Sequence, residues 1–154
     1  MPKIDATQVN VKVGTGYPEK FDKPCAGRRV EQLSLAGGLT QFGAYRAILP
    51  PGCWASQRHM HSAEDEFVYI LTGNPSLIDD DGETILAPGD SCAHPAGDGN
   101  AHHLINKTDS EVSYLIVGSR LPETDHCQYP DVDLDLSANG TDTRVFSHKD
   151  GTPY

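Results

Sequence analysis

Two histidines and an acid in the stretch "RHMHSAEDEF" have the residue types and spacing of half a metal site. Alternate residues of an extended strand share a face, so His59 and His61 would point the same way. Two neighbouring imidazoles suit one divalent ion, and they would repel each other if both were protonated. Glu66 is the candidate carboxylate, because alternation places it with Val68 and Ile70 on an apolar, interior face. The alternative is a polar strand on the surface.

A second histidine-rich stretch, "SCAHPAGDGNAHHLIN", could supply another ligand. His102 and His103 are adjacent, so only one of them can point inward with its strand. His94 is a third candidate, which we expect to line the wall of a pocket.

Together the two stretches resemble the two sequence motifs of the cupin family. The first motif, a glycine, His-x-His, a glutamate and a glycine, is matched by Gly52, His59, His61, Glu66 and Gly73. The second motif, a glycine, Pro-x-Gly, a histidine and an asparagine, is matched by Gly82, Pro95, Gly97, His102 and Asn106. The spacing after Gly97 is longer than in the family pattern. The resemblance selects His102 over His103, which is expected to face outward, and implies four metal ligands: His59, His61, Glu66 and His102.

Three histidines and one carboxylate fit one divalent transition metal ion, which could be Fe, Mn, Ni, Co or Zn. The chain is also similar to a group of small single-domain bacterial cupins, some of which are described as sugar-phosphate isomerases. We therefore expect a metal-dependent enzyme acting on a small polar carbonyl or sugar-like substrate, with isomerisation slightly preferred. The alternatives are an Fe(II)-dependent dioxygenase and a non-catalytic protein that binds a metal and a small molecule.

No catalytic residue can be assigned from the sequence. Side chains that could donate or move a proton in the pocket are Tyr45, Tyr69, His94 and Tyr114. A tyrosine on a strand is more often a packing residue, so these are candidates only. Arg46 and Arg58 could pair with an anionic substrate, or could simply be solvated.

The elements that must position these residues are short strands. Alternating apolar residues over 39–49, 66–72 and 111–120, and a hairpin signal around "DDDG", predict an all-β sandwich or barrel. The cupin resemblance makes this a single double-stranded β-helix, or jelly-roll, barrel. We expect an N-terminal arm over 1–38, the barrel over 39–120, and a C-terminal extension over 121–154 that packs on the barrel or on a partner subunit. The resemblance also favours a homodimer.

Composition narrows the class of protein. The 154 residues carry a formal net charge of −10, which argues against a nucleic acid or an anionic membrane as partner. No apolar run approaches the ~18 residues of a membrane span, and the first residues lack the apolar core of a secretory signal. The four cysteines form no CxxC pair, which favours reduced thiols in a cytoplasmic protein.

Overall fold

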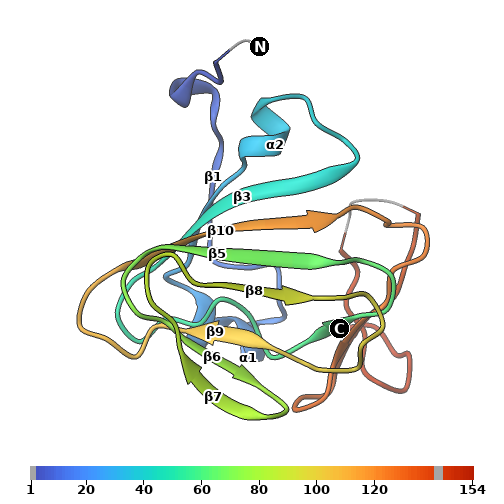
Figure 1. Ribbon diagram of the computed structural model, residues 1–154. Coiled ribbons are helices and arrows are strands. Elements are labelled where there is room, and N and C mark those ends of the chain that lie inside the picture. Colours follow the sequence, from blue (N-terminus) through green and yellow to red (C-terminus); the bar gives the residue numbers. More distant parts are fainter. Residues whose placement is uncertain (1–2, 141–143) are drawn as a thin grey trace.

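The computed structural model describes residues 3–140 and 144–154 and consists mainly of antiparallel strands (Figure 1). One six-stranded sheet has the order β1-β2-β3-β10-β5-β8. Its strands are β1 (Val11–Val13), β2 (Arg29–Glu31), β3 (Phe42–Leu49), β10 (Val112–Ser119), β5 (Glu66–Thr72) and β8 (Ser91–His94). The predicted all-β, jelly-roll architecture is confirmed.

The remaining strands of the described residues form two three-stranded sheets. One is β12 (Leu134–Leu136), β11 (Cys127–Tyr129) and β4 (Met60–His61), and the other is β7 (Gly82–Ile85), β6 (Ser76–Asp79) and β9 (His103–Ile105). The β6–β7 pair is the predicted hairpin, with Asp79 opposite Gly82. The short helices are η1 (Ala6–Gln8), α1 (Glu19–Asp22), η2 (Lys23–Cys25) and α2 (Leu33–Ala36).

The alternation of β5 determines which of its side chains face the core. Val68 and Ile70 are 3% and 0% exposed, whereas Phe67 and Tyr69 lie on the outer face. Gly73 ends this strand with φ of 76°, and a Cβ there would lie 2.5 Å from Val112 Cγ1, so the position requires glycine. The main core contains Val30, Ala47, Leu49, Cys53, Ala55, Val68, Ile70, Leu77, Leu86, Leu104, Val112 and Tyr114.

Both chain ends pack together and on the barrel. Strands β1 and β2 extend the large sheet, and β11 pairs with β4, which begins one residue after His59. A second apolar cluster joins the two ends and contains Phe21, Cys127, Tyr129, Leu134 and Phe146. Strand β2 ends at Glu31, and helix α2 begins at Leu33. No helix in the described parts of the chain is long and apolar enough to cross a membrane.

Candidate functional site

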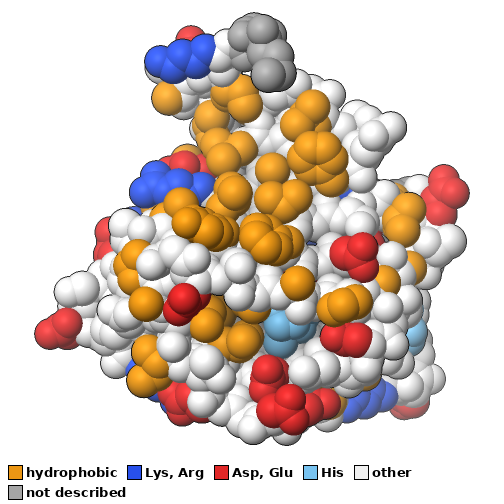
Figure 2. Space-filling model, in the orientation of Figure 1, with side chains coloured by type: hydrophobic (Ala, Val, Ile, Leu, Met, Phe, Trp, Pro, Cys, Tyr) orange, Lys and Arg blue, Asp and Glu red, His pale blue; other side chains and the backbone are white. Residues whose placement is uncertain are grey.

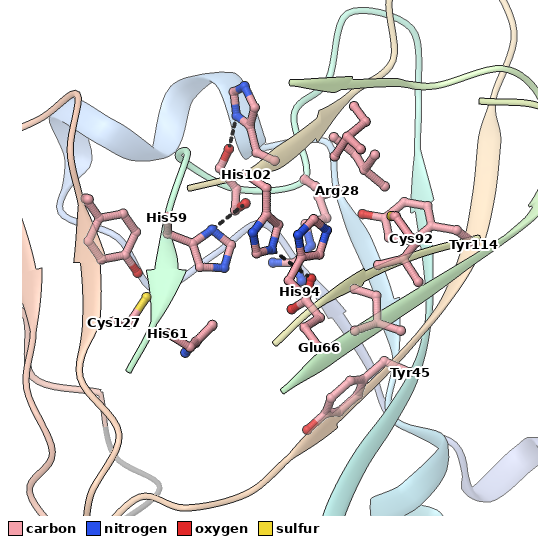
Figure 3. Close-up of a pocket in the computed structure, with 18 of the residues that line it drawn as sticks. Arg28, Tyr45, His59, His61, Glu66, Cys92, His94, His102, Tyr114 and Cys127 are labelled. Carbon is pink, nitrogen blue, oxygen red and sulfur yellow. Dashed lines mark hydrogen bonds and ion pairs between the residues drawn. The ribbon is translucent and has the colours of Figure 1, made fainter. Parts of the chain in front are cut away.

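A cavity of about 140 Å³ opens inside the barrel and contains the histidines singled out above (Figure 3). Its walls come from the barrel strands and from both chain ends, because residues as distant as Tyr17 and Arg144 line it. The lining combines polar side chains with apolar residues of the core such as Val68 and Leu77. The cavity therefore has room for a small polar molecule or an ion.

His59, Glu66 and His102 converge in this cavity. One potential ligand atom from each lies within 4.8 Å of the others. Two backbone hydrogen bonds join His59 and His102, at 3.1 and 2.8 Å, so an isolated antiparallel bridge holds the two imidazoles together. Nε2 of His102 lies 3.3 Å from Oε1 of Glu66, the first residue of β5. Two imidazoles and a carboxylate form a donor set that could hold a divalent transition metal.

At His59 and Glu66, electrostatics favour the protonation states that a metal site needs. Burial, followed by the charge of His61, lowers the pKa of His59 to about 3, so its imidazole is neutral near pH 7. Burial alone would raise the pKa of Glu66, but the hydrogen bond from His102 and the charge of His59 lower it to about 2. A neutral imidazole and an ionised carboxylate can therefore both donate electron pairs to a cation.

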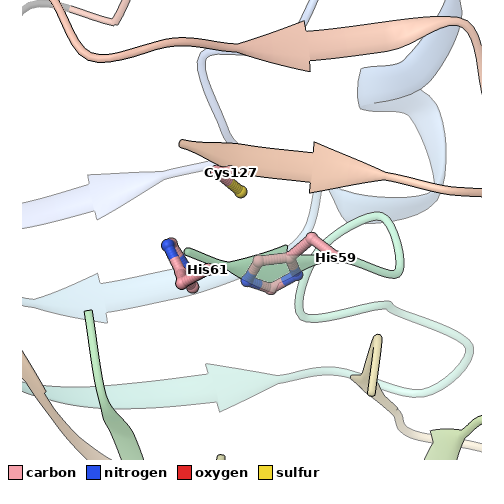
Figure 4. Close-up of side chains that lie close together, drawn as sticks. All are labelled: His59, His61 and Cys127. Atoms are coloured by element: carbon pink, nitrogen blue, oxygen red, sulfur yellow. The ribbon is translucent and has the colours of Figure 1, made fainter. Parts of the chain in front are cut away.

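His61 belongs to a second, overlapping group. Its Nδ1 lies 2.7 Å from Oδ2 of Asp125, and its ligand atom clusters with those of His59 and Cys127 (Figure 4). The four predicted ligands thus form no single group within 4.8 Å. His59, Glu66 and His102 form one group, His59, His61 and Cys127 a second, and His61, Glu64 and Asp125 a third. A metal site that uses all four residues stays a prediction.

Asp125 and Cys127 lie beside His61 although the sequence motifs predict no role for them. Both lie in the C-terminal extension, and the pairing of β11 with β4 sets Cys127 opposite His61. Burial raises the pKa of the Cys127 thiol to about 12, so the thiol keeps its proton near neutral pH. No local signal in "TDHCQY" predicts this pairing, because it depends on the path of the extension across the barrel.

Three of the four pocket candidates line the cavity: Tyr45, His94 and Tyr114. The ring of His94 stacks on His102 with centroids 3.4 Å apart, and its Nε2 is buried without a hydrogen-bond partner. The Tyr114 hydroxyl is also buried and unpartnered, whereas that of Tyr45 accepts from Nη1 of Arg120 at 3.4 Å. These three side chains could contact a bound molecule.

Tyr69 is not a cavity residue, which corrects the sequence prediction. Tyr69 is 40% exposed on the outer face of β5, because it alternates with the buried Val68 and Ile70. His103 was expected to face outward, and this was also wrong. Trp54 covers it, with ring centroids 5.0 Å apart, and its Nδ1 lies 3.0 Å from the Ser56 carbonyl oxygen.

The two arginines considered for substrate binding have protein partners instead. Arg58 pairs with Asp131, with Nε 2.7 Å from Oδ2, and with Asp80. Arg46 pairs with Glu31 at 3.1 Å. Their charges are therefore matched on the protein surface, and neither side chain lines the cavity.

Comparisons with known proteins agree with this architecture. The family model described as Cupin domain matches residues 45–118. A crystal structure named sugar phosphate isomerase from a cupin superfamily, from Silicibacter pomeroyi DSS-3, is 39% identical over 99% of this chain and 96% of that one, with a TM-score of 0.92. A sugar phosphate isomerase candidate from Acidithiobacillus ferrooxidans is 26% identical over 86% and 83% of the chains, with a TM-score of 0.76. The polyketide cyclase RemF from Streptomyces resistomycificus, at 20% identity over 77% and 79% of the chains and a TM-score of 0.62, shares the fold alone. Among curated proteins, none matches this chain significantly.

Proposed function

This chain belongs to the cupin superfamily, and on that premise we propose that it is a metal-dependent enzyme that isomerises a small polar carbonyl or sugar-like substrate. The observation that carries the proposal is the convergence of His59, Glu66 and His102 inside a small cavity. Similarity to a protein named sugar phosphate isomerase supports this reaction class over others.

We assign the metal to His59, His61, Glu66 and His102. The fit rests on the donor chemistry, because the neutral imidazole of His59 and the ionised carboxylate of Glu66 lie beside the imidazole of His102. Nδ1 of His61 is occupied by Asp125, which leaves its Nε2 to bind a cation. A bound divalent ion would supply Lewis-acid stabilisation of negative charge at a substrate oxygen. The donor set suits Fe, Mn, Ni, Co or Zn.

Isomerisation of a carbonyl compound also requires a proton to leave one carbon and reach its neighbour. His94 is the proposed base, because its Nε2 faces the cavity unpartnered and burial lowers its pKa to about 4, which keeps the imidazole neutral. Tyr114 is the proposed hydrogen-bond donor to the substrate, because burial raises the pKa of its hydroxyl and the hydroxyl remains protonated.

Solvent deuterium exchange tests this assignment. Protein loaded with each candidate ion in D2O should incorporate deuterium next to the carbonyl of a sugar or sugar phosphate, as followed by NMR. We expect His94→Gln to slow the exchange by about 10²-fold or more, as for loss of a general base. Tyr69→Phe, on the outer face, is the control and should exchange like the wild type. Absence of exchange across a broad panel of sugars and hydroxy carbonyl compounds would contradict the proposal.

An Fe(II)-dependent dioxygenase is the second candidate. The specific observation in its favour is that His59, His102 and Glu66 constitute two histidines and one carboxylate, the set used by non-haem Fe(II) oxygenases. Oxygen uptake by the iron-loaded protein with diketones, thiols and catechols distinguishes the dioxygenase from the isomerase. Uptake that depends on both substrate and His102, without deuterium exchange, would favour the dioxygenase.

We also propose that the protein is a homodimer. The outer face of the large sheet is apolar, with Phe42 on β3 and Phe67, Tyr69 and Leu71 on β5 all at least 40% exposed (Figure 2). An apolar sheet face of this kind commonly marks a protein interface. Light scattering during size-exclusion chromatography should give twice the mass of one chain, and Phe67→Lys should return the protein to a monomer. A monomeric wild-type protein would refute this proposal.

A further inference from the structure

Arg28 is an arginine that the fold directs toward the inside of the barrel. Its backbone is fixed by two hydrogen bonds, since its N–H donates to Cys25 O at 3.0 Å and its carbonyl accepts from Gly14 N at 2.8 Å. Arg28 lies two positions before Val30, which is 7% exposed and faces the core, so alternation turns both side chains inward. Arg28 accordingly lines the cavity that contains the histidines (Figure 3).

Within residues 3–140 and 144–154, Arg28 pairs with no carboxylate. Its Nε is buried without a hydrogen-bond partner. The other arginines nearby differ, because Arg29 pairs with Glu111 and Arg46 pairs with Glu31. A buried guanidinium N–H without an acceptor is costly, so the free protein keeps an unfavourable arrangement at this one position.

Unsatisfied polar atoms concentrate in this cavity. In the described parts of the chain, four buried side-chain polar atoms lack a hydrogen-bond partner, and three belong to cavity residues: Arg28 Nε, His94 Nε2 and Tyr114 OH. Native proteins satisfy nearly all buried polar groups, so a cluster of exceptions points to a missing binding partner. The three atoms offer a cationic donor, an imidazole nitrogen and a hydroxyl to one molecule.

Positive charge also gathers here, although the chain has a net charge of −10. Arg144 of the C-terminal extension lines the same cavity. Burial, followed by the charges of Arg144 and Arg28, lowers the pKa of Lys12. Arg28 and Arg144 both line the cavity, and their charges also act on Lys12 outside it, so the positive charge here favours an anionic group as the ligand.

We propose that Arg28 binds the anionic group, a carboxylate or a phosphate, of the small molecule that occupies this cavity. A guanidinium forms paired, charge-assisted hydrogen bonds with either oxyanion. A cavity of about 140 Å³ is close to the ~150 Å³ that accommodates benzene, so the group in contact with Arg28 belongs to a small molecule. The inference rests on the proposed function only for the reacting end of that molecule, which would contact His94 and the metal ligands.

Anion binding by the metal-free protein tests Arg28 separately from the metal. Titration calorimetry with pyruvate and with inorganic phosphate measures a carboxylate and a phosphate as separate probes. We expect wild-type protein to bind at least one probe, and Arg28→Gln to weaken that binding about tenfold or more. Arg29→Gln is the matched control, because it removes the same charge from the adjacent residue outside the cavity, and it should bind like the wild type. The probe that binds more tightly identifies the oxyanion.

Two measurements keep the outcomes distinct. The melting temperature of Arg28→Gln should equal or exceed that of the wild type, because the substitution removes an unpaired cation. Its cobalt affinity should also be unchanged. Absence of binding by both probes at millimolar concentrations, undiminished binding in Arg28→Gln, or equal weakening in Arg29→Gln would overturn the proposal. Anion binding that depends on Arg28 in a protein that takes up no metal would support Arg28 and refute the proposed metal-dependent function.

Discussion

Nδ1 of His61 lies 2.7 Å from Oδ2 of Asp125, so the C-terminal extension contacts the histidines of the barrel directly. The other carboxylate oxygen of Asp125 accepts hydrogen bonds from the backbone N–H groups of Ala63 and Glu64, at 3.0 and 3.2 Å. The carboxylate is therefore held by the loop that follows His61. This arrangement fixes the ring orientation of His61 and favours the tautomer with its proton on Nδ1.

Asp125→Asn should weaken metal binding while the fold persists. The amide can still accept the two backbone hydrogen bonds, but its NH2 group would face His61 Nδ1 and disfavour the tautomer that leaves Nε2 unprotonated. Loss of such a carboxylate typically costs 10–100-fold in metal affinity, and we expect a loss in this range. Competition with a chromogenic chelator measures it.

Asp135→Asn provides the matched control for this experiment. Asp135 accepts from His126 Nε2 at 2.7 Å, so it forms the same kind of pair away from the cavity. Its metal affinity should equal that of the wild type. Equal losses in the two variants would show that Asp125 acts through overall stability and not through His61.

Removing His59 should abolish metal binding in the cavity, because His59 belongs to both groups of potential ligands whose members all line the cavity. The third group, His61, Glu64 and Asp125, lies partly outside it. We expect His59→Ala, purified without a histidine tag, to retain no transition metal by elemental analysis. His103→Asn is the comparison, since Asn can still donate to the Ser56 carbonyl oxygen that His103 Nδ1 approaches. It should keep the full metal content. If His103→Asn lost the metal while His59→Ala kept it, the choice of ligands would be wrong.

The alternation of inward and outward side chains along β5 explains why Glu66 could be predicted from the sequence. The apolar partners of Glu66, Val68 and Ile70, predict an inward carboxylate, and the structure places it beside His102. The same rule, applied strictly, excludes Tyr69, which has the opposite parity to Glu66. Tyr69 accordingly lies outside the cavity, contrary to its prediction as a pocket residue.

Contacts made by the chain ends could not be predicted in this way. Cys127 and Arg28 line the cavity, and Asp125 reaches His61, because β11 pairs with β4 and β2 pairs with β3. These pairings join segments far apart in sequence, and short strands with weak alternation leave their register undetermined. The burial of His103 has a similar origin, because the loop containing Trp54 covers its face of β9.

A cobalt spectrum should distinguish the two triads. We expect the ion to bind Glu66, which is already ionised, in preference to Cys127, whose thiol must first lose a proton. The cobalt protein should therefore lack a thiolate-to-metal charge-transfer band in the near ultraviolet, and Cys127→Ser should keep the metal stoichiometry. A strong band that disappears in Cys127→Ser would instead assign the ion to His59, His61 and Cys127.

The metal-free protein should lose stability as the pH falls below about 6.5. The ordinary pKa of histidine is 6.5, and burial lowers that of His59 to about 3. Between pH 6.5 and pH 3 the unfolded chain therefore binds a proton at His59 that the folded protein excludes. The contribution of His59 is thus present above pH 6.5 and is lost on acidification. His61 acts in the opposite sense. Burial opposes its charged form, but Asp125 raises its pKa overall, so its contribution is lost as the pH rises through that pKa.

Urea unfolding between pH 7 and 5 measures this effect. For one proton the slope is about 1.4 kcal/mol per pH unit, and His59→Gln should reduce the slope by up to that amount. Chelator must be present throughout, because bound metal would stabilise the folded state at the higher pH. If the pH dependence of the unfolding free energy were unchanged in His59→Gln, His59 would bind its proton equally well in the folded and unfolded states, which contradicts the prediction.

Asn106, a residue of the second motif, should prove to be structural. It is 0% exposed, and its Nδ2 donates to the carbonyl oxygens of Leu49 and Ser110, at 2.9 and 2.8 Å. Its Oδ1 accepts from the backbone N–H and the hydroxyl of Thr108, at 3.0 and 2.7 Å. Asn106→Ala would leave these buried groups without partners, so we expect a loss of about 2–4 kcal/mol in the free energy of unfolding. Asn10→Ala, which removes an exposed hydrogen bond to Gln32, should cost no more than about 0.5 kcal/mol. If metal affinity fell in Asn106→Ala while stability held, Asn106 would belong to the metal site and not to the strand end.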